Sequence, residues 1–155
     1  MMKKMHHSGS LYRLIYCSRN MINQGAPPET EIRAILTASR RNNKLDNITG
    51  ALLFTASGFA QVLEGPREVV ERSFERISGD PRHADVTVLS FTPTERRSFP
   101  DWSMGFSGQI SPDAADPLVH LLADTTSAGP RVTTGSDVLH LLEQVVQRED
   151  EWIPA

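Results

Sequence analysis

Residues 58–66, with the sequence GFAQVLEGP, have the pattern of a β-strand that leads into a helix. At the strand period of two, Phe59, Gln61 and Leu63 share one face. The opposite face carries Ala60, Val62 and Glu64. A glutamine thus lies between two large apolar residues on a face that we expect to be buried, where an unmade amide hydrogen bond costs about 1–3 kcal/mol. The strand therefore predicts a polar partner for Gln61 inside the core.

The flanking segments predict a fold in which strands and helices alternate irregularly. The expected strands are 11–17, 47–56, 59–64, 86–92 and a short one within 104–108. Helices are expected to begin at Pro28 and at Pro66, the second ending near Ser78, because proline suits the first turn of a helix. The order is β-α-β-β-α-β-β, which predicts an α+β, ferredoxin-like sheet with two helices on one face.

Two amphipathic helices, 117–125 and 136–150, are expected to form a C-terminal two-helix extension. The apolar stripe of the second comprises Val138, Leu141, Leu142, Val145 and Val146. Exposure of such a stripe costs roughly 25 cal/mol for each Å². We therefore expect these helices to pack on the second sheet face, which bears Ile15 and Val62, or across a symmetric dimer contact.

Composition excludes several classes of protein. A net charge of −3 with interspersed signs indicates no nucleic-acid partner, and the pairs Arg40–Arg41 and Arg96–Arg97 are interpreted as solvated surface. The single cysteine, Cys17, excludes an intramolecular disulfide and a cysteine metal cage. No apolar run approaches the roughly 20 residues that span a bilayer, and residues 1–10 lack the apolar part of a secretory signal. The expectation is a cytoplasmic protein without a membrane partner.

Common catalytic and metal-binding motifs are absent from the sequence. It contains no glycine-rich phosphate loop, no G-x-S-x-G and no H-E-x-x-H. The histidines are His6, His7, His83, His120 and His140. Their scatter along the expected elements predicts no metal site.

Polar residues in the expected core are more informative. Tyr16 lies on the first strand, Asn43 lies near the end of the first helix, and Gln61 lies on the third strand. Singly, each has an ordinary explanation: a rim tyrosine, a helix cap, and an amide bonded to backbone. Together they suggest a shared polar partner, such as a planar heteroaromatic ligand with an amide-like edge.

Five stretches resemble the BLUF domain, a flavin-binding module that senses blue light. They are LIYCS, RRNNKLDNITGALLF, FAQVLEGP, ISGDPRHADV and FPDWSMGF, and the resemblance covers about residues 10–107. It implies a photosensor domain at 10–107. Residues 1–9 are expected to be a disordered lead because of their composition, and residues 108–155 an output or oligomerisation extension. The cofactor that the resemblance implies is FAD, with FMN as a possibility that the sequence leaves open.

The resemblance also implies roles for individual residues. The expected cofactor-binding residues are Tyr16, Ile35, Asn43, Gln61, Arg76, Ile77, Asp80, Arg82 and His83. Tyr16 is expected to exchange an electron and a proton with the excited flavin, and Gln61 to rearrange its hydrogen bonds by rotation or tautomerisation. Trp102 and Met104 are expected to relay the signal and, two residues apart on a short strand, to share a face on which one of them adjoins Gln61.

Two other interpretations stay open at this point. One is an acylphosphatase-like hydrolase on the same fold, although the loop after the first strand, SRNMINQG, gives little support. The other is a colourless, dimeric interaction module. The resemblance favours a sensor that is not an enzyme, since the residues after Ser107 are too few for an output enzyme, and that acts through an unidentified protein partner or as a homodimer or larger homo-oligomer.

Overall fold

The computed structural model describes residues 11–22, 28–55, 58–109 and 135–146 of the 155-residue chain. Its elements are β1 (Leu11–Asn20), α2 (Pro28–Asp46), β2 (Thr49–Thr55), β3 (Gly58–Pro66), α3 (Arg67–Ser78), β4 (His83–Pro93), β5 (Gly105–Gln109) and α5 (Gly135–Val146). The predicted order of strands and helices is therefore confirmed. The expected helix at 117–125 lies outside the described residues.

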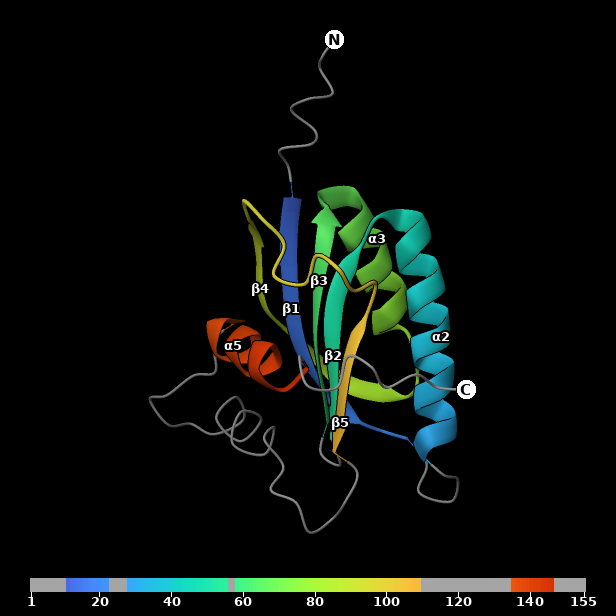
Figure 1. The fold of residues 1–155 in the computed structure, drawn as a ribbon. Helices are drawn as coiled ribbons and strands as arrows, with labels where there is room; N and C mark the ends of the chain where they lie inside the picture. The colour runs from blue at the N-terminus through green and yellow to red at the C-terminus, as the bar shows by residue number, and fades with distance from the viewer. Residues whose placement is uncertain (1–10, 23–27, 56–57, 110–134, 147–155) are drawn as a thin grey trace.

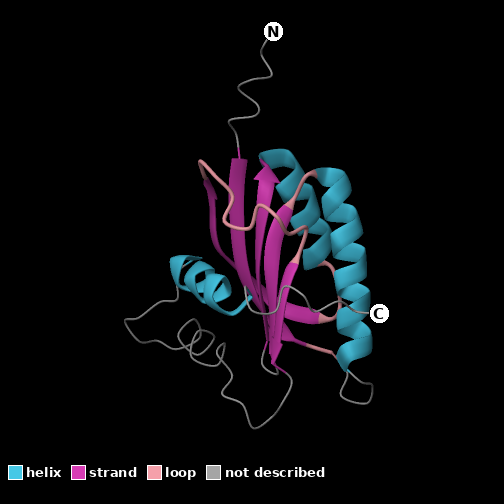
Figure 2. Cartoon of the chain, in the orientation of Figure 1, coloured by secondary structure: helices cyan, strands magenta, loops and turns pink. Residues whose placement is uncertain are grey.

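The five strands form one sheet in the order β4-β1-β3-β2-β5. β1 pairs antiparallel with both β3 and β4, β2 pairs antiparallel with β3, and β5 pairs parallel with β2. Helices α2 and α3 lie on one face of the sheet and α5 lies on the other (Figure 1, Figure 2). The chain thus has the expected α+β, ferredoxin-like fold.

Strand alternation divides the apolar interior into two cores. The helix-side core contains Leu14, Tyr16, Ile32, Leu36, Leu52, Phe59, Leu63 and Val70. The α5-side core contains Ile15, Cys17, Ala51, Leu53, Ala60, Val62, Phe99, Val138 and Leu142. Both faces predicted for residues 58–66 are confirmed. α5, the described part of the helix expected at 136–150, packs on the face bearing Ile15 and Val62, which is the first of the two arrangements expected for it.

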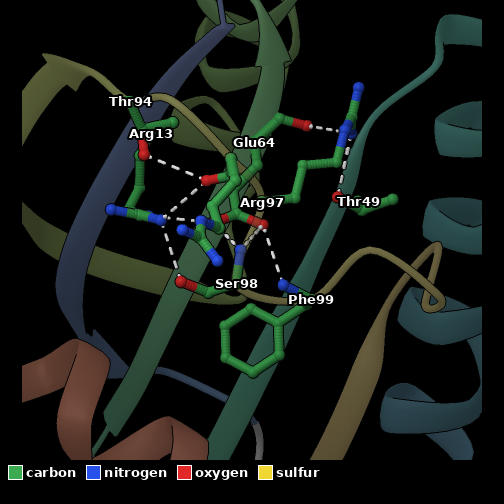
Figure 3. A network of polar contacts seen from close by, with 8 residues as sticks. Arg13, Thr49, Glu64, Thr94, Arg97, Ser98 and Phe99 are labelled. Atoms are coloured by element: carbon green, nitrogen blue, oxygen red, sulfur yellow. Dashed lines mark hydrogen bonds and ion pairs between the residues drawn. The ribbon is translucent and has the colours of Figure 1, made fainter.

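A connection of residues 94–104, here called the crossover segment, links β4 at one edge of the sheet to β5 at the other. It runs across the sheet in Figure 1, and its Phe99 packs in the α5-side core. It is attached to the sheet by Glu64, which has no exposed side-chain surface (Figure 3). The Glu64 carboxylate accepts hydrogen bonds from Arg13 Nε (2.9 Å), Ser98 N (2.8 Å) and Phe99 N (3.1 Å). These donors offset the desolvation of a buried charge.

Arg97 gives the crossover segment a second attachment. Its Nη1 donates to Thr49 Oγ1 and to the Glu64 carbonyl, both at 2.9 Å, and its Nη2 donates to Asn47 O at 3.0 Å. Burial lowers the pKa of its guanidinium, with the nearby charge of Glu64 opposing that shift. The interpretation of Arg96–Arg97 as solvated surface is therefore wrong for Arg97, whose guanidinium binds the backbone carbonyls of Glu64 and Asn47.

Candidate functional site

A cavity of ≈250 Å³ lies among α2, α3 and the helix-covered face of the sheet. Its lining residues are Tyr16, Ile35, Ala38, Ser39, Asn42, Asn43, Leu52, Phe59, Gln61, Arg76, Ile77, Asp80, Arg82 and His83. The structure thus brings together all nine residues expected to bind a cofactor. The sequence interpretation missed five lining residues. Ala38, Ser39 and Asn42 lie on α2, where helical spacing from Ile35 would have placed them on the same face, and Leu52 and Phe59 lie on β2 and β3.

The side chain of Gln61 is hydrogen-bonded to two other buried side chains, Tyr16 and Met104. The Tyr16 hydroxyl donates to Gln61 Oε1 at 2.5 Å, and Gln61 Nε2 donates to Met104 Sδ at 3.4 Å. Tyr16 and Gln61 are directly opposed in the β1–β3 ladder. Both side chains are buried, at 2% and 3% exposure, so water does not compete for these bonds.

The Tyr16 phenol is held as a hydrogen-bond donor. Burial, and to a lesser degree the charges of Cys17 and Asp80, raise the pKa of Tyr16 far above its ordinary value. Its ring packs against Phe74 and His83, with centroids 5.6 Å and 5.9 Å away. Tyr16 therefore stays protonated and oriented toward Gln61.

Trp102 and Met104 do not share a face. Met104 lies in the helix-side core beside Gln61, whereas Trp102 stacks on Phe99 at 5.9 Å and packs against the α5-side core. The expectation of a common face is wrong because residues 102–104 precede β5 as bends and coil, where the strand period of two does not apply. The expectation that one of the two adjoins Gln61 is confirmed for Met104.

Asn43, near the end of α2, contacts the same segment. It is 3% exposed, and its Nδ2 donates to the Ser103 carbonyl at 2.7 Å. Ile35 and Ile77 bring aliphatic surface to the cavity from α2 and α3. The cavity wall therefore combines apolar side chains from two helices with buried amides from α2 and β3.

Charged residues lie at the α3–β4 connection. Arg82 donates from Nε and Nη2 to the two carboxylate oxygens of Asp80, at 3.0 and 2.9 Å, and lies 3.5 Å from Glu31. Burial would raise the pKa of Asp80, but the hydrogen bonds and charge of Arg82 outweigh it, so the pKa lies below its usual value. Asp80 is therefore a carboxylate at neutral pH.

His83, the first residue of β4, also lines the cavity. Its Nε2 lies 2.9 Å from the Ile77 carbonyl, and its Nδ1 lies 2.7 Å from Ser18 Oγ. Because a carbonyl only accepts, Nε2 donates to it, while the Ser18 hydroxyl can serve Nδ1 as either donor or acceptor. Both ring nitrogens are thus bonded within the protein, and His83 fixes the end of α3 against β1.

The residues that line the cavity fit a flavin ring. Such a ring needs apolar surface for its faces and amide-type partners for its pyrimidine edge, and Ile35, Ile77, Asn43 and Gln61 supply them within one cavity. No group of three potential metal ligands occurs in the described part of the chain. Among the helices of those residues, none is long and apolar enough to cross a membrane.

Residues 11–105, more than half of the chain, match the family model described as BLUF, sensors of blue light using FAD. The chain belongs to the BLUF family. The matched region is accordingly a flavin-binding domain of the blue-light-sensing kind, and the resemblance noted in the sequence is confirmed.

Curated BLUF relatives are much longer than the region that they share with this chain. Photoactivated adenylate cyclase subunit beta of Euglena gracilis is 37% identical over 86 residues, which are 54% of this chain and 10% of that protein. The blue light- and temperature-regulated antirepressor BluF of Escherichia coli (strain K12) is 37% identical over 71 residues, which are 44% of this chain and 18% of that protein. This chain therefore spans less than a fifth of the length of these two relatives.

Some solved BLUF structures match along nearly their whole length. The dark-state structure of BlrB has a TM-score of 0.68 at 33% identity, covering 90% of this chain and 98% of BlrB. The photo-activated state of BlsA has a TM-score of 0.67 at 28% identity, covering 88% and 94%. Klebsiella pneumoniae BlrP1 with FMN and cyclic diGMP, at 36% identity and a TM-score of 0.57, matches over only 26% of its chain.

Proposed function

We propose that this chain is a blue-light photoreceptor that binds FAD without a covalent link and signals by rearranging the hydrogen bonds of Gln61. The observation that carries the proposal is the buried series Tyr16–Gln61–Met104. Tyr16 and Gln61 line the cavity, and Met104 belongs to the segment leading to β5.

Binding would use residues from both helices and from the sheet. Ile35 of α2 and Ile77 of α3 would contact the two faces of the ring, and Asn43 would bind its pyrimidine edge. Arg76, Asp80 and Arg82 would lie toward the ribityl chain. FAD is proposed because the family description names it, although the FMN in the BlrP1 structure keeps the mononucleotide as an alternative for the test.

A bound flavin supplies absorption of blue light and an excited state that accepts an electron. Tyr16 would donate one electron and its phenolic proton and would recover both on recombination, so that its side chain is unchanged at the end. The lasting change would be at Gln61, whose amide has an acceptor at one end and two donors at the other. Rotation or tautomerisation exchanges the group that Gln61 presents without moving the backbone.

The signal would leave the cavity through the crossover segment. Met104 contacts Gln61 at one end of this path, while Phe99 packs in the α5-side core with Val138 and Leu142. A change at Gln61 would thus bias the docking of α5, and through it a second copy of the chain or an unidentified partner protein. The chain itself would act as a sensor, with no catalytic step of its own.

A light-minus-dark absorption spectrum of the purified protein tests the proposal. A yellow protein whose blue band shifts slightly to the red on illumination and returns in darkness supports it. A colourless protein supports the hydrolase or the interaction module instead. Bleaching of the blue band would indicate a covalent adduct and would contradict the Gln61 mechanism. No adduct with Cys17 is expected, because Cys17 lies on the opposite face of β1 from Tyr16. Extraction and chromatography of the flavin distinguish FAD from FMN.

A further inference from the structure

Arg40 of α2 is not the solvated surface residue that its sequence suggests. Its side chain is partly buried, and its Nε donates to the Met104 carbonyl at 3.0 Å. Burial lowers the pKa of its guanidinium, which nevertheless keeps its proton at neutral pH. Arg40 does not line the cavity, so the expected flavin contacts give no reason for its placement.

Three consecutive backbone carbonyls before β5, those of residues 102–104, each accept a hydrogen bond. The pairs are Trp102 O with Gly50 N (3.1 Å), Ser103 O with Asn43 Nδ2 (2.7 Å) and Met104 O with Arg40 Nε (3.0 Å). Asn43 also lines the cavity, where the proposed function assigns its amide to the flavin. Two side chains donate to these carbonyls, Asn43 and Arg40. Asn43 would also bind the flavin, whereas Arg40 would not contact it.

The position of Met104 affects which orientation of Gln61 is stable. In the described arrangement Gln61 Nε2 donates to Met104 Sδ at 3.4 Å. A rotated amide would present Oε1 to the same sulfur, so that two acceptors would face each other without a proton between them. A fixed Met104 thus opposes the rotated amide, whereas a Met104 that can move away does not.

We propose that Arg40 is a positioning residue for the light reaction: by holding the Met104 carbonyl, it keeps Met104 Sδ against Gln61 and favours the dark arrangement of the amide. This inference rests on the proposed function. A purely structural role, in which Arg40 only ties α2 to the start of β5, would change the stability of the protein without changing the photocycle.

Three variants separate these roles. Arg40→Met removes the donor. Arg40→Gln places an amide N–H the same number of bonds from Cα as Arg Nε, so it restores the donor without the charge. Arg33→Met is the matched control, because Arg33 is exposed on the same helix.

The flavin-loaded variants are illuminated, and the decay of the red-shifted form is followed in darkness. We expect Arg40→Met to slow recovery about three- to tenfold, as for the loss of one hydrogen bond. Arg40→Gln should recover close to the wild-type rate, and Arg33→Met at that rate. The flavin content should be the same in all variants.

A second measurement needs no light. In protein labelled with ¹³C in the methionine methyl groups, the Met104 resonance, assigned through Met104→Leu, should shift in Arg40→Met and stay near its wild-type position in Arg40→Gln and Arg33→Met. A normal recovery rate together with an unmoved Met104 resonance in Arg40→Met overturns the inference. A wild-type protein without any red shift overturns the proposed function instead, so the two failures are distinguishable.

Discussion

The Tyr16 hydroxyl lies 2.5 Å from Gln61 Oε1, and the two residues are directly opposed on neighbouring antiparallel strands. Their contact is therefore set by the register of β1 against β3, in the middle of the sheet. Because a one-residue slip would move either side chain to the other face, this register is strongly specified. A signal that begins here can change side-chain hydrogen bonds while the strands stay fixed.

Gln61→Leu should abolish the light-induced red shift while leaving flavin bound. Leucine keeps the apolar contacts but has no donor or acceptor to exchange, and Asn43, Ile35 and Ile77 remain in the cavity wall. The measurements are the flavin content after gel filtration and the light-minus-dark spectrum. A normal red shift in this variant would contradict the assignment of Gln61 as the switch.

Tyr16→Phe should also keep flavin and lose the red shift, because the ring remains but the electron and proton donor is gone. It should lower the free energy of unfolding by about 1–3 kcal/mol, since Gln61 Oε1 loses its buried donor. Urea unfolding and the difference spectrum check the two effects separately. A variant with full photoactivity would require another donor to the flavin.

Glu64→Gln should destabilise the fold by about 2–4 kcal/mol, because it leaves the charge of Arg13 without its partner and sets an amide NH₂ near backbone N–H donors. Glu68→Gln, an exposed change of the same kind on α3, should stay within about 0.5 kcal/mol of wild type. Urea midpoints of the two variants test this. Equal stabilities would show that the buried carboxylate does not hold the crossover segment.

The stability of the protein should fall at alkaline pH in part through Cys17. Burial raises the pKa of its thiol from 9.0 to about 12, so the unfolded chain ionises first. The stabilising contribution is complete below pH 9 and is lost as the pH rises toward 12, by at most about 1.4 kcal/mol per pH unit. Urea unfolding at several alkaline pH values should therefore show a flatter pH dependence for Cys17→Ala than for wild type. Parallel curves would exclude this titration.

Light should speed hydrogen exchange of the amides in α5. Val138 and Leu142 share a core with Phe99 of the crossover segment, whose far end contacts Gln61 through Met104. The expected change in docking free energy is a few kcal/mol at most. Exchange measured by mass spectrometry in darkness and under illumination, with Gln61→Leu as the control, tests this. Identical exchange in both states would make α5 a static cover for the sheet.

The sequence predicted those parts of the fold that depend on local periodicity. Alternation in residues 58–66 identified both faces of β3. The apolar stripe of the expected last helix indicated a buried face, and in α5 Val138 and Leu142 of that stripe pack on the second sheet face. The nine expected cofactor-binding residues were identified from the resemblance to the family, and all nine line the cavity. They lie on helices and strands or directly beside them.

Predictions failed where irregular backbone decides the outcome. Trp102 and Met104 diverge because their segment is not a strand, and no local pattern marks that difference. Arg40 and Arg97 resembled surface pairs in the sequence, yet each binds carbonyls supplied by distant parts of the chain. Such long-range backbone partners depend on tertiary structure and leave no periodic signal.

The cavity lining ends at His83, whereas the crossover segment, β5 and α5 all follow it in the chain. Under the proposed function, the residues that bind the chromophore therefore precede the segments that carry the signal away from Met104. Sequence changes after residue 93 would then alter the partner that receives the signal while every residue that lines the cavity stays the same. Under the proposed function, chromophore binding and biological output would therefore be able to evolve separately.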